Sequence, residues 1–120
     1  MKLGHIGVPV ADIARAKAFY DAIADSIGLK QLADHDDFVG YGLDDSYEFY
    51  IHTGKVGISG LHVCFDVNSK EAVEEFYKTG LEAGGTDNGA PGIREDYSPT
   101  YYAAFVIDPD GNNIEAVFRG

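Results

Sequence analysis

Apolar and polar residues alternate in two short segments, residues 6–10 and residues 63–67. The apolar positions in them are Ile6, Val8, Val10, Val63, Phe65 and Val67. Residues two apart share one face of a β-strand, so each segment is a predicted strand with one apolar face. His5 and His62 fall on the opposite, polar face of these strands.

Each predicted strand is followed by a predicted amphipathic helix. Asp12 can cap the first helix and Gly28 can end it. Asn68 and Glu71 resemble a capping box for the second helix, which Gly84 and Gly85 would end. Apolar residues recur at helical spacing, and they are Ile13, Ala16, Phe19, Tyr20, Ile23, Ile27, Val73, Phe76, Tyr77 and Leu81. These stripes should pack on the apolar strand faces, which leaves both histidines on the uncovered face of a sheet.

Two β-hairpins are predicted, one in each half of the chain. The first joins residues 38–41 to residues 47–52, and the second joins residues 101–107 to residues 113–118 through a turn that contains Pro and Gly. The stretch 86–100 between the second helix and the second hairpin is rich in Gly, Pro, Asn and Asp, and we predict a long loop there.

The two halves are copies of one unit. Aligning His5 with His62 also brings Tyr20 onto Tyr77, and aligning the two hairpins brings Tyr50 onto Glu115. Repetition of roles as well as residues is typical of a duplicated supersecondary unit. We therefore read residues 1–120 as a single domain, with module 1 over 1–53, a linker over 54–60 and module 2 over 61–120.

His5, His62 and Glu115 form a candidate metal site. Glu115 interrupts an apolar strand between Ile114 and Ala116, which places it on the same uncovered face as the histidines. A carboxylate on a partly enclosed surface is costly unless it is paired or bound to a cation. Two imidazoles and a carboxylate suit a divalent metal ion (Zn, Ni, Mn or Fe(II)) and leave positions open for substrate or water. For either histidine alone, the alternative is an ordinary hydrogen-bonded side chain.

The order of His5, His62, the turn 108–112 and Glu115 resembles the vicinal oxygen chelate superfamily. That superfamily includes glyoxalase I, extradiol dioxygenases, and fosfomycin and bleomycin resistance proteins. Residues 84–92, followed by 101–105, are similar to a subgroup of short glyoxalase-like bacterial proteins. The resemblance implies an α+β fold of two tandem βαβββ modules, forming a curved mixed sheet around a central cup. It also implies a homodimer, with modules paired either within one chain or between chains.

The resemblance further implies a metal-dependent, glyoxalase-like lyase or isomerase. It would act on a small oxygen-chelating substrate, such as a thiol adduct of a 2-oxoaldehyde, with Glu115 or Glu48 as the catalytic proton shuttle. Glyoxalase I has a fourth carboxylate where this chain has Tyr50. Glu48 and His52 share the face of Tyr50, and a bulge could bring either one into its place. The alternatives are an extradiol-type dioxygenase and a drug-sequestering protein of the bleomycin-resistance type.

Five residues are candidates for substrate binding, and they are Tyr50, His52, Arg94, Tyr97 and Tyr101. Arg94 can hold an anionic group with two parallel hydrogen bonds, or it can pair with a neighbouring acidic residue, Glu95 or Asp96. The tyrosines of the second hairpin region can be pocket walls, hydroxyl donors or strand packing. The single cysteine, Cys64, shares the face of His62, and we expect a buried, inert thiol.

Charge and hydropathy narrow the choice of partners. The chain has 20 acidic residues against 9 Lys and Arg, for a net charge of −11. Nucleic acids and anionic membranes are bound mainly through Lys and Arg, so neither is an expected partner. We see no apolar run long enough for a membrane span and no separate signal segment, and we expect a cytoplasmic protein with a small-molecule substrate.

Overall fold

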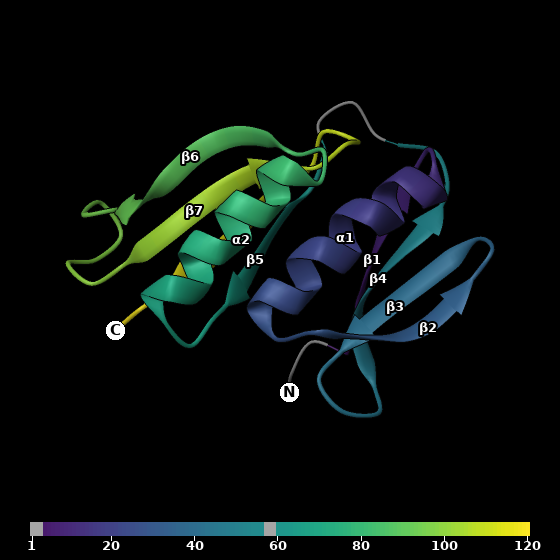
Figure 1. Ribbon diagram of the computed structural model, residues 1–120, viewed down its shortest axis with the longest axis horizontal. Coiled ribbons are helices and arrows are strands. Elements are labelled where there is room, and N and C mark those ends of the chain that lie inside the picture. The colour runs from purple at the N-terminus through teal and green to yellow at the C-terminus, as the bar shows by residue number, and fades with distance from the viewer. Residues whose placement is uncertain (1–3, 57–59) are drawn as a thin grey trace.

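The structure is a computed structural model that describes residues 4–56 and 60–120, and it contains two copies of one βαβββ unit (Figure 1). Module 1 consists of β1 (Ile6–Val10), α1 (Ile13–Ile27), β2 (Lys30–His35), β3 (Phe38–Gly42) and β4 (Tyr47–Thr53). Module 2 consists of β5 (His62–Asp66), α2 (Lys70–Glu82), β6 (Thr86–Ile93), β7 (Tyr102–Ile107) and β8 (Asn113–Phe118). The predicted α+β fold of two βαβββ modules is confirmed, and residues 57–59 of the predicted linker lie outside the described residues.

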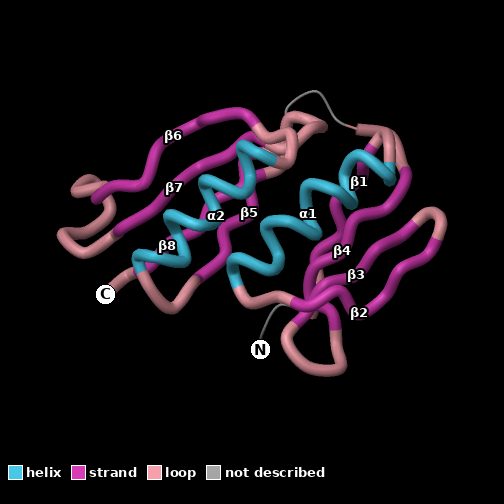
Figure 2. Tube along the Cα trace, in the orientation of Figure 1, coloured by secondary structure: helices cyan, strands magenta, loops and turns pink. Residues whose placement is uncertain are grey.

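The described strands form two four-stranded mixed sheets, with the orders β1-β4-β3-β2 and β5-β8-β7-β6. In each sheet the first and last strands of the module run parallel, and the other neighbours run antiparallel. Each helix covers one face of its own sheet, and α1 and α2 pack against each other (Figure 2). Within residues 4–56 and 60–120, no helix covers the opposite face of either sheet, as the alternation in sequence predicted.

The strand register confirms that the two halves are equivalent. Gly7 on β1 pairs with Tyr50 on β4, and the corresponding Cys64 on β5 pairs with Glu115 on β8. Tyr50 and Glu115 therefore occupy the same position in the two modules.

The predicted ends of the helices are right for α1 and wrong for the start of α2. Asp12 caps α1 by accepting a backbone N–H at 3.1 Å, and Gly28 ends it in the left-handed conformation at φ 84°. Asn68 is not the cap of α2. Ser69 caps that helix instead, because its backbone is extended and its hydroxyl accepts the N–H three residues further on at 3.1 Å.

The predicted loop over 86–100 is wrong in its first half, where β6 pairs with β7. The register of this pair shifts twice, between Asp87 and Gly89 and again between Gly89 and Gly92. Gly89 has φ 149°, which other residues rarely adopt. Bulges of this kind remove the two-residue alternation, so a strand rich in Gly is read as a loop.

A buried carboxylate joins the two modules. Asp108, in the turn between β7 and β8, is 3% exposed and accepts a 2.5 Å hydrogen bond from the Tyr20 hydroxyl on α1. The same carboxylate accepts the backbone N–H groups of Asp110 and Asn112 and the Asn112 side-chain amide. Burial and the neighbouring Asp108 carboxylate raise the pKa of Tyr20 well above its usual range, so its hydroxyl remains a donor.

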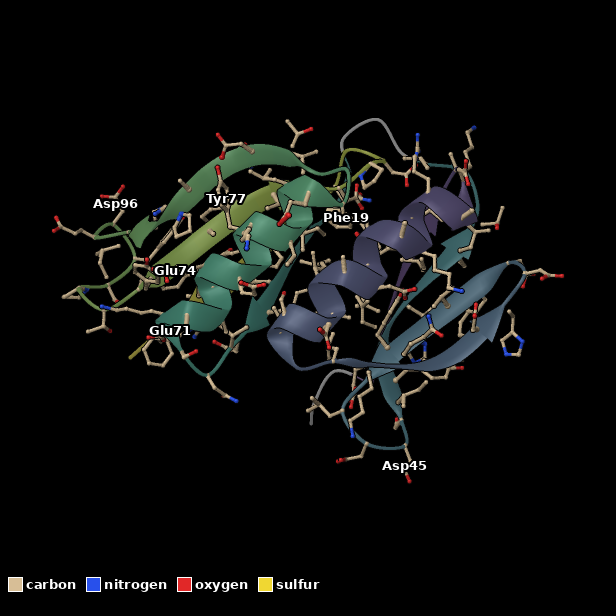
Figure 3. The ribbon with its side chains drawn as sticks, in the orientation of Figure 1. Phe19, Asp45, Glu71, Glu74, Tyr77 and Asp96 are labelled. Carbon is tan, nitrogen blue, oxygen red and sulfur yellow. The ribbon has the colours of Figure 1, made fainter. Side chains whose placement is uncertain are left out.

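Phe19 of α1 lies on the side of the helix that meets α2 (Figure 3). It is fully buried in the same cluster as Phe76 of α2, so a single apolar core runs between the modules.

Among the described residues, no helix is long and apolar enough to cross a membrane.

We predict that Tyr20→Phe lowers the free energy of unfolding by about 1–3 kcal/mol, because it leaves the buried Asp108 carboxylate short of one donor. Urea titration followed by circular dichroism measures the change. The matched control is Tyr102→Phe, which removes an exposed 2.7 Å hydrogen bond to Glu74 and should change stability by less than about 0.5 kcal/mol. Equal effects of the two substitutions would contradict the role given to Tyr20.

Candidate functional site

His62 and Glu115 meet on the uncovered face of module 2. The His62 Nε2 atom lies 3.0 Å from Glu115 Oε1, and its Nδ1 atom lies 3.0 Å from the backbone oxygen of Asn113. A carbonyl oxygen only accepts, so Nδ1 carries the proton of this contact. In a neutral imidazole, Nε2 then has no proton, and it faces a carboxylate oxygen. The contact is satisfied when a proton lies between the two atoms, carried by either group, or when both atoms bind one cation.

The second oxygen of Glu115 is held by Tyr101. Its hydroxyl donates to Glu115 Oε2 at 2.5 Å, and Glu115 itself is 3% exposed. Burial and the hydrogen bond to Glu115 raise the pKa of Tyr101 above its usual range, so the hydroxyl stays protonated. Glu115 is therefore fixed in orientation with Oε1 directed at His62.

Cys64 lies beside this carboxylate but is more exposed than expected. The residue is exposed to solvent, so the prediction of a buried cysteine is wrong. Desolvation of the thiol, followed by the charge of Glu115, nevertheless raises the pKa of Cys64 to about 12. The thiol is therefore protonated near neutral pH, as expected for an inert cysteine.

Arg94 also lies over this face and does not pair with either acidic residue that follows it. Its guanidinium donates to two backbone carbonyls of β6 at 2.7 and 2.8 Å, and lies 5.4 Å from the centre of the Phe105 ring. Phe105 in turn stacks on His62, with ring centres 6.2 Å apart at 21°. The outermost ring here is Tyr97, which is 66% exposed and lies 4.9 Å from Tyr101.

The corresponding face of module 1 is aromatic. The Tyr50 ring lies 5.5 Å from His5, 5.0 Å from Phe38 and 5.7 Å from His52. Tyr47 belongs to the same cluster, with its ring 6.3 Å from that of Tyr50. Sequence reasoning missed Phe38 and Tyr47. One signal for Tyr47 is Gly40, whose missing side chain makes room for the Tyr47 ring, as Gly7 does for the Tyr50 ring.

Glu48 does not share the face of Tyr50, contrary to the expectation from alternation. The pairing of β3 with β4 shifts register so that Gly42 lies opposite Tyr47 and Tyr41 lies opposite Phe49. Glu48 is the extra residue at this bulge, and it lines a separate groove of about 320 Å³ with Phe49. The bulge therefore puts Tyr47, and not Glu48, beside Tyr50.

The three predicted metal ligands do not come together within one chain. Over residues 4–56 and 60–120, no three His, Cys, Asp or Glu side chains lie close enough to hold a metal ion. His62 and Glu115 are in contact on module 2, whereas His5 packs against Tyr50 on module 1.

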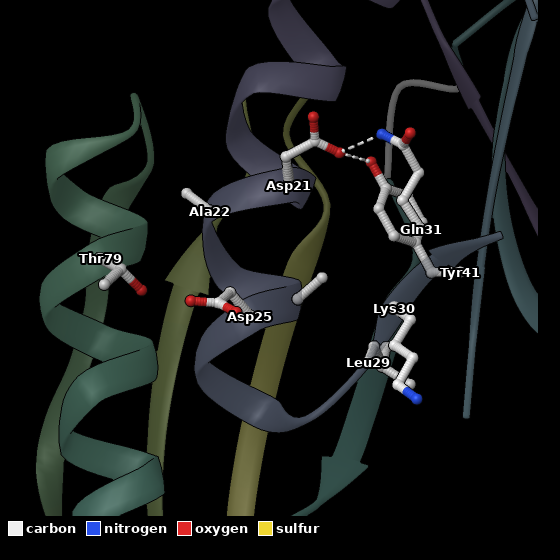
Figure 4. Close-up of a pocket in the computed structure, with 9 residues that line it drawn as sticks. Asp21, Ala22, Asp25, Leu29, Lys30, Gln31, Tyr41 and Thr79 are labelled. Carbon is white, nitrogen blue, oxygen red and sulfur yellow. Dashed lines mark hydrogen bonds between the residues drawn. The ribbon is translucent and has the colours of Figure 1, made fainter. Parts of the chain in front are cut away.

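A larger groove, of about 720 Å³, lies elsewhere, between the end of α1, the start of β2 and Thr79 of α2 (Figure 4). Its Asp21 carboxylate accepts 2.8 Å hydrogen bonds from Gln31 and from the Tyr41 hydroxyl. Burial, followed by this bond, raises the pKa of Tyr41 above its usual range. None of the predicted site residues lines this groove, and we assign the candidate site to the uncovered sheet faces.

Two βαβββ modules, with a histidine and a glutamate on an uncovered sheet face, define a protein of the vicinal oxygen chelate class. The family model of the Glyoxalase/Bleomycin resistance protein/Dioxygenase superfamily matches residues 2–116, and the chain belongs to this family. No curated protein was found to match the chain in sequence.

Solved structures agree with this assignment. A glyoxalase/bleomycin resistance protein from Albidiferax ferrireducens is 29% identical with a TM-score of 0.82, and the match covers 98% of each chain. A glyoxalase-related enzyme from Fulvimarina pelagi is 16% identical with a TM-score of 0.74, over 98% of this chain and 88% of the other. A lactoylglutathione lyase from Agrobacterium tumefaciens is 18% identical with a TM-score of 0.70, over 98% of this chain and 92% of the other. The last two likenesses show the fold alone.

We predict that Cys64 reacts slowly with iodoacetamide at pH 8, because its pKa of about 12 keeps the thiolate scarce. A free cysteine has a pKa of about 8.5, so the rate in EDTA should be lower than that of a model thiol by more than about 10-fold. Glu115→Gln should raise the rate, because it removes the nearest negative charge. Asp66→Asn is the control and should raise it less, because Asp66 is the weakest cause of the shift. A wild-type rate equal to that of the model thiol would contradict the assignment.

Proposed function

We propose that this protein is a metal-dependent, glyoxalase-like enzyme that acts on a small oxygen-chelating substrate, such as a thiol adduct of a 2-oxoaldehyde. The observation that carries the proposal is the 3.0 Å approach of His62 Nε2 to Glu115 Oε1, with the Nδ1 atom already used by a carbonyl. Both facing atoms offer lone pairs, and a divalent Zn, Ni, Mn or Fe(II) ion is a cation that suits them.

A second copy of the chain would complete the site. One chain brings only two of the three expected ligands together, and His5 lies on the uncovered face of the other module. We infer a homodimer in which His5 of one copy meets His62 and Glu115 of the other. An isologous dimer of this kind contains two equal sites.

The residues on these faces can then take different roles in the reaction. The metal would polarise two substrate oxygens as a Lewis acid. Glu115, held by Tyr101, takes a proton from the carbon that bears sulfur and returns it to the neighbouring carbon, so the product is an isomer of the substrate. The unused N–H groups of Arg94 hold an anionic group of the substrate. Tyr50, His52 and Tyr97 are proposed as pocket walls, and Glu48 lies in a separate groove and has no role.

Two other functions make different predictions. An extradiol-type dioxygenase would use the same three ligands with Fe(II) and consume oxygen with a catechol. A drug-sequestering protein would need no metal; the net charge of −11 and the separation of His5 from the other two residues favour it. Turnover of the methylglyoxal–glutathione adduct supports the glyoxalase-like enzyme, and oxygen consumption supports the dioxygenase. Drug tolerance that is unchanged by Glu115→Ala supports the sequestering protein.

We predict that the purified protein binds about one divalent metal ion per chain and that His62→Ala weakens the binding by at least about 100-fold. Inductively coupled plasma mass spectrometry gives the stoichiometry, and competition with a chelating dye gives the affinity. The matched control is His35→Ala, which removes an exposed histidine of β2 and should leave binding unchanged. Failure of the wild-type protein to bind metal would refute the proposal.

We predict that mixing His5→Ala with Glu115→Ala restores metal binding, because each mixed dimer contains one intact set of ligands. Random exchange of subunits should recover about a quarter of wild-type binding. Mixing His62→Ala with Glu115→Ala is the control, because those two ligands lie in the same copy and no intact set can form. If the first mixture recovers nothing, the site does not draw its ligands from two chains.

A further inference from the structure

The aromatic face of module 1 contains a pocket of about 580 Å³, and the proposed function uses only His5 and Tyr50 of the residues that line it. It is lined by His5, Phe38, Asp45, Ser46, Tyr47 and Tyr50. Asp45 lies in the loop between β3 and β4, at one extremity of the molecule (Figure 3).

The three carbocyclic rings of this pocket are steeply inclined to one another. The rings of Phe38 and Tyr47 are 5.3 Å apart at 67°, and those of Tyr47 and Tyr50 are 6.3 Å apart at 78°. The third pair, Phe38 and Tyr50, is 5.0 Å apart at 40°. Rings at these angles form the walls of a hollow. Parallel stacked rings would form a flat surface instead.

The backbone under the rings is built to hold them. Tyr50 lies between Gly7 on one side and Gly40 on the other in the strand register. A Cβ atom on Gly7 would collide with the Tyr50 ring, and a Cβ on Gly40 would lie 2.8 Å from the Tyr47 ring. Two neighbouring glycines therefore let two tyrosine rings lie close to the sheet.

The charge of the pocket is negative. Asp45 is its one carboxylate, no Lys or Arg is among the described lining residues, and none of the ion pairs of the described chain involves Asp45. The faces of aromatic rings also carry negative charge density, which attracts cations. We propose that this pocket binds an organic cation, a quaternary or otherwise alkylated ammonium group.

Alkylation of the cation follows from the scarcity of hydrogen-bond acceptors. A bare ammonium ion is strongly hydrated and would exchange its water for one carboxylate and a few hydroxyl groups. An alkylated ammonium group is less hydrated, and its methyl groups bury apolar surface against the rings. The inference goes beyond the proposed function, because binding needs neither a metal nor turnover.

The test compares choline with its neutral isostere, in which a tert-butyl group replaces the trimethylammonium group. Proton NMR titration of the full chain in EDTA should shift the N-methyl resonance upfield, because the methyl protons lie over ring faces. Choline should bind about two- to fivefold more tightly than the isostere, the factor expected from a cation–π contact at an accessible site. Equal affinity for the two ligands would overturn the proposal, and so would absence of binding by choline.

Matched variants locate the site. Tyr47→Leu and Asp45→Asn should each weaken choline binding by about two- to fivefold or more, since each removes one attraction for the cation. Tyr47→Phe keeps the ring, and Asp44→Asn makes the same charge change at the neighbouring residue outside the pocket lining. These two controls should bind as the wild type does. If the controls weaken binding as much as the test variants, choline is held elsewhere and the proposal fails. His62→Ala should still bind choline, so the choline test can succeed even if the proposed metal site proves wrong.

Discussion

The buried carboxylate of Asp108 determines how the two modules meet. A charge so far from solvent is stable only when donors surround it, and three of its donors come from its own turn. The fourth is the Tyr20 hydroxyl of α1, so the Asp108 carboxylate has all four donors only when the helix of module 1 lies against it. Beside it, Asp110 accepts from the Ala11 N–H and from Arg15 at the start of the same helix. The modules therefore join through α1, and their uncovered sheet faces stay apart, with His5 on one and His62 with Glu115 on the other.

The sequence was sufficient to predict the strands that carry the site. Alternation predicts which face each residue of β1 and β5 occupies, and alignment of the two hairpins predicts that β4 and β8 are equivalent. This is why the equivalence of Tyr50 and Glu115 could be predicted and is seen in the register. Where a bulge adds a residue, the face of every later position changes, and alternation gives the wrong answer. Glu48 was misplaced for that reason, and Tyr47 was missed. The separation of His5 from the other two ligands depends on tertiary contacts such as Tyr20 with Asp108, which have no local signal.

Positions 50 and 115 are equivalent in the two modules, but their surroundings differ. The buried carboxylate of Glu115 is contacted by three polar side chains, those of His62, Tyr101 and Cys64. Tyr50 has rings around it and glycines on both flanks. A tyrosine placed at position 115 would leave His62 and Tyr101 without their partner. The sequence difference at this one position therefore requires the differences around it.

The positions of the Arg and Lys side chains make the two uncovered sheet faces electrostatically different. Arg15, Lys17 and Arg119 are used in ion pairs with aspartates. Arg94 lies over the uncovered face of module 2 with backbone carbonyls as its acceptors, and no ion pair among the described residues compensates its positive charge. The uncovered face of module 1 has aromatic rings and Asp45. In a dimer that brings these two faces together, a ligand with an anionic end and an alkylated cationic end would be held in one orientation only. Its central oxygens would then lie near Glu115, so that the order of charges along the ligand would decide which carbon loses its proton.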